Sequence, residues 1–221
     1  MDSIHTRKSF DDELGEVKQD ILKMGSVVEE MLVGSIKALR ERNATLAEEI
    51  IAKDDVVDEY NLVIEQRCLE LLALQQPMAR DLRTLAAALY IIKDVERMGD
   101  YALDIAKAAR KLADLEPVKP LVKIPRIAQI VQGMLHDSLQ AFVNRDVEAI
   151  SEVAREDDEV DALYRQVRDE MIDLIQANPD TAQRAVELIL AARYLERIAD
   201  HITNVGERIA YMETGEIREL H

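Results

Sequence analysis

The sequence predicts an all-α protein of two tandem, pseudo-symmetric antiparallel three-helix bundles, with six long helices in total. Apolar residues recur at steps of three and four over nearly all of the 221 residues, which is the helical period. Gly and Pro number only 7 and 5, and no alternating β-branched run bounded by turn residues occurs. An internal duplication indicates that the helices form two equivalent halves.

The duplication is clearest in one pentapeptide. Residues 96–100 read ERMGD, and residues 196–200 read ERIAD. A second phrase, DDVVD at 54–58, recurs as DDEVD at 157–161 with nearly the same separation. Such a separation is too long for a solenoid repeat, so two large equivalent units are expected.

The first unit is expected to span residues 1–116. Its first helix ends near Asn43, and its second covers residues 45–74 with an apolar face formed by Ile51, Leu62, Leu69 and Leu72. Residues 75–77 (QQP) end that helix, because an interior proline loses a backbone hydrogen bond and clashes with the preceding turn. The third helix covers residues 78–113.

The second unit is expected to span residues 126–221, after a stiff linker at 117–125 that holds three of the five prolines. Its helices are predicted over residues 126–144 and 147–177. The last helix starts after the break Asn178-Pro179-Asp180 and reaches about Met212, where Thr214-Gly215-Glu216 stops it.

The charge limits the partners that the chain can recognise. Lys and Arg total 28 against 44 Asp and Glu, which gives a net charge of −16. Such a surface repels nucleic acid and anionic lipid, whereas it attracts cations and basic protein patches. Direct binding of a small anion by this chain is therefore disfavoured unless a bound metal bridges it.

Cysteine usage and hydropathy indicate a cytoplasmic protein. Cys68 is the single cysteine, which excludes an intrachain disulfide and fits a reducing compartment. Its position on an apolar helix face predicts a buried small hydrophobe. The first ten residues hold no apolar core segment of a signal peptide, and no run approaches 18 apolar residues.

Paired carboxylates are the candidate functional groups. In each duplicated phrase, two carboxylates stand four positions apart and so share one helix face. The eight candidate ligands are Asp54, Asp58, Glu96, Asp100, Asp157, Asp161, Glu196 and Asp200. Several of these fall on or beside the predicted apolar faces, where an ionised carboxylate needs a partner.

Two interpretations of these carboxylates stay open. One is a salt-bridge ladder, because Lys93, Arg97, Arg193 and Arg197 stand three residues before acidic residues. The other is a metal site, because all-oxygen clusters suit hard or borderline cations such as Mg, Ca, Mn, iron or Zn. A ferritin-like di-iron site is disfavoured, because no His follows Glu96 or Glu196 by three residues.

His201 is expected at a rim or the surface, and His136 is expected to be exposed.

Two longer segments resemble the signatures of a known family. Residues 79–83 (ARDLR) with 93–100 (KDVERMGD), and later 192–201 (ARYLERIADH) with Asn204 and 214–216 (TGE), resemble the PhoU family of bacterial phosphate-signalling regulators. Two departures stand out. Asp104 occupies a position where the family often has Asn, and Ala199 replaces the glycine seen as Gly99.

The resemblance implies a cytoplasmic negative regulator of phosphate uptake rather than an enzyme. Its partners would be the ATPase subunit of the phosphate ABC transporter and a membrane sensor histidine kinase. The long amphipathic helices separately favour a homodimer. The resemblance also implies multinuclear metal clusters on the eight carboxylates named above. Two alternatives remain open: a metal-dependent enzyme using a bridged carboxylate cluster, and a purely structural helical module without metal.

Overall fold

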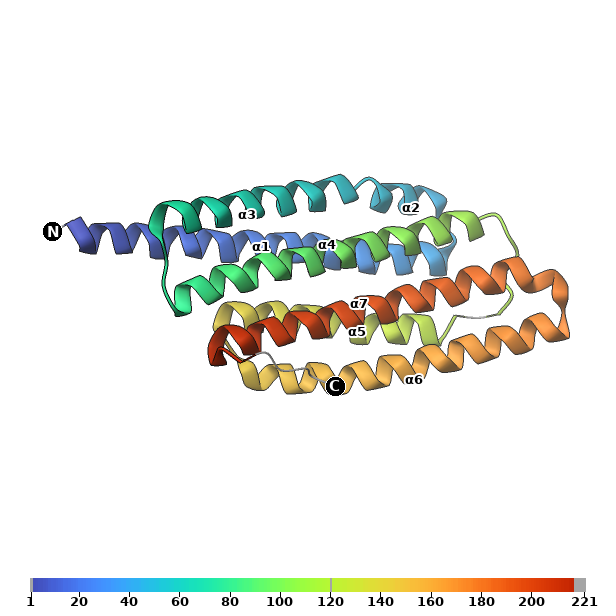
Figure 1. The fold of residues 1–221 in the computed structure, drawn as a ribbon. Coiled ribbons are helices and arrows are strands. Elements are labelled where there is room, and N and C mark those ends of the chain that lie inside the picture. The colour runs from blue at the N-terminus through green and yellow to red at the C-terminus, as the bar shows by residue number, and fades with distance from the viewer. Residues whose placement is uncertain (1, 120, 217–221) are drawn as a thin grey trace.

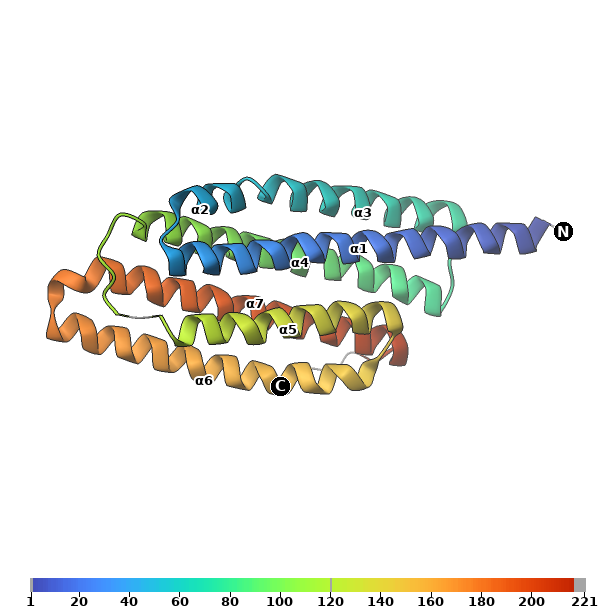
Figure 2. The same ribbon diagram turned by 180° about the vertical axis from the view of Figure 1, so that it is seen from behind.

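The protein is all-α, as the sequence predicts. The computed structural model describes residues 2–119 and 121–216, and no strand occurs among them. The first half contains α1 (Asp2–Glu41), α2 (Ala44–Ile51), α3 (Asp54–Gln75) and α4 (Arg80–Leu112). The second contains α5 (Lys123–Asn144), α6 (Val147–Ala177), the 3₁₀ turn η1 (Pro179–Thr181) and α7 (Ala182–Thr214). The halves lie side by side as one elongated bundle (Figures 1 and 2).

The prediction of one continuous second helix is wrong. The chain breaks at residues 52–53 into α2 and α3, whereas the equivalent α6 is continuous (Figure 1). Asp54 and Asp55 form the acidic first turn of α3. Carboxylates there are favoured by the exposed N–H groups and the positive end of the helix dipole, so this pair marks a helix start.

The predicted apolar face of the second helix is also wrong for α3. Leu62 and Leu69 are 65% and 51% exposed. The residues that α3 buries are Val57, Asn61, Ile64, Cys68 and Leu71. The leucines at 62 and 69 therefore form part of an outer apolar face. Cys68 is buried as expected, and burial raises the pKa of its thiol to about 12.

The predicted helix ends are mostly close to those observed. Gly215 closes α7 in the left-handed conformation, with φ of 77°, and donates its N–H to Tyr211 O. The helix predicted from Arg126 begins earlier, at Lys123. Pro125 thus lies in the first turn of α5, where a backbone N–H would have no helical partner.

A single apolar core runs through both halves. Helix α4 packs against α7, and α1 packs against α5, so each half covers part of the other. The two central helices bury many alanines, among them Ala88, Ala102, Ala106, Ala191 and Ala199. Small side chains allow close helix approach, and burial of the surrounding Ile, Leu and Met side chains supplies the main stabilising free energy.

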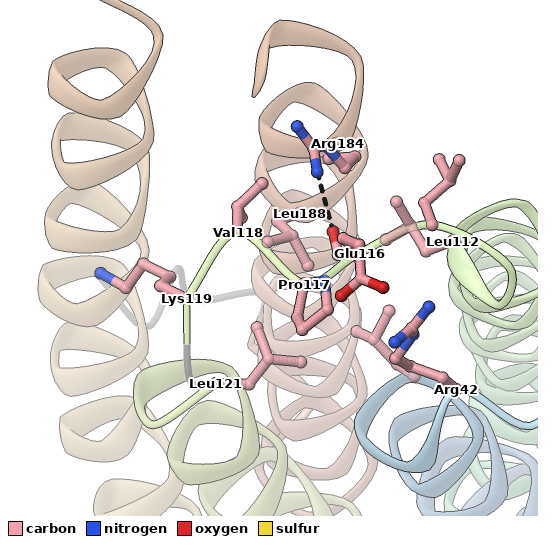
Figure 3. Close-up of a pocket in the computed structure, with 11 residues that line it drawn as sticks. Arg42, Leu112, Glu116, Pro117, Val118, Lys119, Leu121, Arg184 and Leu188 are labelled. Atoms are coloured by element: carbon pink, nitrogen blue, oxygen red, sulfur yellow. Dashed lines mark hydrogen bonds between the residues drawn. The ribbon is translucent and has the colours of Figure 1, made fainter. Parts of the chain in front are cut away.

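Polar contacts tie the halves together at the linker end. Arg184 Nη1 donates to the carbonyl oxygen of Glu116 at 3.0 Å, which fixes the linker against α7 (Figure 3). Nearby, Lys111 of α4 pairs with Glu187 of α7 at 3.0 Å. A small pocket at this junction has walls of mainly leucine, proline and valine side chains. The linker is therefore packed onto the bundle.

The contact of α1 with α5 generates a prediction about two glycines of one helix. A Cβ placed on buried Gly25 would lie 2.1 Å from Leu139 Cδ1 of α5, whereas one on Gly15 would meet nothing within 4 Å. We expect Gly15→Ala to stabilise the protein by about 0.5–1 kcal/mol, because alanine favours the helix. Overpacking of about 1–3 kcal/mol should make Gly25→Ala neutral to destabilising. Urea unfolding of both variants tests this difference, and equal stabilisation by both would contradict the packing described.

Candidate carboxylate sites

In the first half, the predicted carboxylates flank a close crossing of α3 and α4. A Cβ on Gly99 would lie 3.3 Å from Val57 Cγ1 and 3.6 Å from Val28, so the absent side chain lets the helices approach. Val57 lies between Asp54 and Asp58 in the sequence, just as Gly99 lies between Glu96 and Asp100. The crossing therefore brings the two pairs towards one another.

The mutual repulsion of these carboxylates is visible in their pKa values. Burial raises the pKa of Asp54, and the charges of Asp100 and Asp58 raise it further. Burial also raises the pKa of Glu96; Arg97 opposes the rise, while Asp100 and Asp58 add to it. Asp58 and Asp100 thus lie within electrostatic reach of both Asp54 and Glu96.

The second half repeats this arrangement with a deeper glutamate. Glu196 is buried, and burial raises the pKa of its carboxyl. Asp200 and Asp161 raise this pKa further, whereas Arg193 and Arg197 lower it. Its Oε2 atom is buried, accepts no hydrogen bond from the described residues, and lies 3.7 Å from Arg197 Nε. Asp157 is half-buried.

Arginines already neutralise part of this charge. Arg97 Nη1 contacts Asp100 at 2.7 Å, and Arg197 Nη1 contacts Asp200 at 3.0 Å. These pairs are the ladder expected from the three-residue spacing.

The lysine and arginine preceding the two glutamates behave differently. Arg193 pairs with Glu196, but Lys93 pairs with Glu65 of α3 at 2.7 Å. The lysine before Glu96 is therefore directed to a neighbouring helix, whereas the arginine before Glu196 pairs with that glutamate on its own helix.

The carboxylate clusters meet some requirements of a metal site but not others. Carboxylate oxygens under mutual repulsion suit a hard cation, which would relieve that repulsion. In residues 2–119 and 121–216, however, no three His, Cys, Asp or Glu side chains converge in a geometry that could hold a metal ion. Binding would require side-chain rearrangement, including release of the carboxylates from Arg97 or Arg197.

A polar contact that the sequence did not predict crosses from α4 to α7. His201 Nδ1 lies 2.8 Å from Asp94 Oδ1, and Asn204 Nδ2 donates to the same oxygen at 3.4 Å. The symmetric position holds an aromatic contact, Tyr101 with Tyr194, whose ring centroids are 5.9 Å apart. Asp94 and Tyr194 occupy equivalent places in the two repeats, as do Tyr101 and His201. The spacing of the repeats is therefore the sequence feature that could have located these contacts.

The two histidines differ in exposure. The side chain of His201 is partly exposed, at 22%, and packs between α4 and α7. His136 is exposed, as expected. Asp104, which departs from the family pattern, pairs with Lys107 at 3.0 Å on its own helix.

Comparisons with known proteins agree over almost the full chain. The family model described as "PhoU domain" matches residues 21–109 and again 124–209. The chain is 36% identical to a "Phosphate-specific transport system accessory protein PhoU homolog" of Clostridium acetobutylicum, covering 98% of this chain and 99% of the relative. A protein of the same name from Aquifex aeolicus is 41% identical, with 93% of each chain covered.

A solved structure agrees with the fold. The crystal structure of PhoU from Pseudomonas aeruginosa superposes with a TM-score of 0.90 at 32% identity, covering 94% of this chain and all of that one. Among the described residues, no helix has both the length and the apolarity needed to cross a membrane.

The raised pKa of Glu196 predicts that removing the charge of its carboxyl group increases the free energy of unfolding at neutral pH. Because the folded state binds the proton more tightly than the unfolded state, ionisation costs stability as pH rises. We expect Glu196→Gln to increase the free energy of unfolding at neutral pH in EDTA, and this gain to disappear below about pH 4.5, where both states are protonated. Urea unfolding at several pH values measures it.

Glu170→Gln is the matched control with the opposite sign. Hydrogen bonds from Lys119 and Lys123 lower the pKa of Glu170, so its ionised form stabilises the fold above the unfolded-state pKa. This variant should lose stability at neutral pH. A loss of stability in both variants would contradict the charge balance described at Glu196.

Proposed function

This chain belongs to the PhoU family, and on that premise we propose that it is a cytoplasmic accessory protein that negatively regulates phosphate uptake and phosphate-starvation signalling. It acts as an adaptor between the ATPase subunit of a phosphate ABC transporter and a membrane sensor histidine kinase. The observation that supports this proposal is that both halves match the family model. Similar proteins are named as accessory proteins of the phosphate-specific transport system.

The outer face of α3 is a suitable surface for such a protein partner. Leu62, Val63, Leu69 and Leu74 are 65%, 44%, 51% and 79% exposed. Met78, just beyond the helix, is 80% exposed. A helix that leaves several large apolar side chains exposed is suited to contact with another protein.

Part of this face is particular to the first half, although Ile172 of α6, 41% exposed, stands where α3 has Leu69. The repeat places Arg165 and Gln166 of α6 where α3 has Leu62 and Val63. Core packing does not explain the leucines, because the buried side of α3 is formed by other residues. We therefore assign protein contact to the outer face of α3, defined by Leu62, Val63, Leu69 and Leu74.

A complementation experiment tests regulation and surface together. In a bacterial host deleted for its own PhoU protein, a phosphate-starvation reporter should be active even in high phosphate. Expression of this chain should restore repression, and Leu62→Gln/Leu69→Gln should fail to do so while keeping its helical content and melting temperature. The control, Val186→Gln/Leu190→Gln, changes exposed apolar residues of α7 and should repress normally.

Two outcomes would count against this function. Failure of the parent chain to restore repression, despite normal expression and folding, would contradict the regulatory proposal. Full repression by Leu62→Gln/Leu69→Gln would place the contact elsewhere. Sedimentation of the parent chain and of Leu62→Gln/Leu69→Gln also tests whether the chain is a homodimer. A difference between the two would show that the α3 face is the contact between copies.

We further propose that the carboxylate clusters take up cations. In the first cluster, Asp58 and Asp100 repel both Asp54 and Glu96, and Lys93 pairs with Glu65 of the neighbouring helix. Cation binding at the carboxylates would offset this repulsion without altering the apolar core. The same chemistry is the basis of the alternative enzyme hypothesis.

Elemental analysis tests the cation proposal. Untagged protein purified without chelator should carry about one metal ion or more per half, and Glu96→Ala/Glu196→Ala should lose it. Glu48→Ala/Glu159→Ala removes exposed, ion-paired carboxylates and should keep the metal. Absence of metal from the parent, even after reloading, would favour the salt-bridge interpretation. Phosphoester hydrolysis by loaded protein, lost in Asp100→Ala, would instead support the enzyme alternative.

A further inference from the structure

A group of cations meets one carboxylate at the end of the bundle opposite the linker. Arg80 Nη2 contacts Glu213 Oε2 at 2.9 Å, and Arg145 Nη1 contacts Glu213 Oε1 at 2.9 Å. Lys18 and Arg83 approach from α1 and α4. The contributing elements are α1, the start of α4, the residue after α5, and the last turn of α7, which lie together at this end (Figures 1 and 2).

Cationic side chains gather near Glu213, although the chain as a whole is acidic. The protein carries a net charge of −16, yet Arg80 and Arg145 both pair with Glu213, and Lys18 and Arg83 lie close by. Burial lowers the pKa of Lys18, and the charges of Arg145 and Arg80 lower it further, although Glu213 opposes them. Glu213 therefore does not cancel the positive potential that Lys18 experiences.

Structural roles account for two of the four cations. Lys18 Nζ donates to Val143 O at 3.5 Å, and Arg83 Nε donates to Met212 O at 3.2 Å. Both carbonyls lie in the last turns of α5 and α7, where cations offset the negative end of the helix dipole.

The remaining two arginines converge on one anion. Arg80 and Arg145 both donate to Glu213, and Arg145 also donates to Thr84 Oγ1 at 3.3 Å. Arg145 is held in the left-handed region, with φ of 60°, at the end of α5. The bonds to Glu213 and Thr84 hold the Arg145 guanidinium in place, and its side chain is only 21% exposed. Two guanidinium groups that share one anion form an arrangement suited to an oxyanion.

We propose that Arg80 and Arg145, with Lys18 and Arg83 behind them, form a binding site for a phosphate group, and that Glu213 is its intramolecular competitor. A tetrahedral phosphate offers more acceptor oxygens and more negative charge than one carboxylate, which favours it against Glu213. The site is separate from the carboxylate clusters and needs no metal. Because Glu213 belongs to α7, phosphate binding would free the last turn of α7 from Arg80 of α4.

Calorimetric titration of the full chain with inorganic phosphate, in EDTA and at constant ionic strength, tests this proposal. Removing the competing charge in Glu213→Gln should tighten phosphate binding about tenfold. Arg145→Lys keeps the charge but loses the forked donor, and it should weaken binding about tenfold. Glu213→Gln/Arg145→Ala should lose the gain produced by Glu213→Gln alone.

Glu187→Gln is the matched control, because Glu187 also pairs across α4 and α7 but with a single lysine. It should leave phosphate affinity unchanged. A phosphoserine peptide titrated in parallel separates free phosphate from a phosphorylated partner: binding of either ligand with this variant pattern supports the site. Absence of binding for both ligands in the parent and in Glu213→Gln, or binding unaffected by Glu213 and Arg145, would overturn it.

Discussion

The antiparallel packing of α4 against α7 is the constraint on which the rest of the structure depends. These two helices bring the halves together through buried alanines and larger aliphatic side chains, and they carry the two copies of the Glu-Arg-x-x-Asp phrase. Because each helix also packs within its own half, α4 on α3 and α7 on α6, the central pair fixes where both carboxylate clusters lie. Neither cluster could keep its position if this packing were lost.

Charge is distributed on this scaffold in a way that composition alone would not suggest. Carboxylates that repel one another are held together at the helix crossings, where burial raises the pKa of Asp54, Glu96 and Glu196. At the end opposite the linker, Arg80 and Arg145 enclose Glu213. The described residues therefore include regions where carboxylates repel one another and a region where arginines gather around a carboxylate. A regulator that responds to ions could use both kinds of region on one rigid bundle.

Much of the fold could be predicted from sequence, because helix period, proline breaks and the repeat are local signals. The pairing of Glu96 with Asp100 follows from a four-residue step on one helix, and the repeat extended it to Glu196 and Asp200. The break between α2 and α3 could not be predicted, since neither Gly nor Pro marks residues 52–53 and the equivalent Asp157-Asp158 pair lies inside the continuous α6. The outward position of Leu62 depends on which face of α3 meets its neighbours. Contacts such as Asp94 with His201 depend on the register of α4 against α7, which no local pattern encodes.

The central claim is that the two repeats form one folding unit through α4 and α7. Hydrogen exchange followed by mass spectrometry across a urea series tests it most directly, because peptides report on each helix separately. The account predicts that peptides from the centres of α4 and α7 lose protection at the same urea concentration, in one cooperative step. Loss of protection throughout one half while the other half stays protected would contradict it.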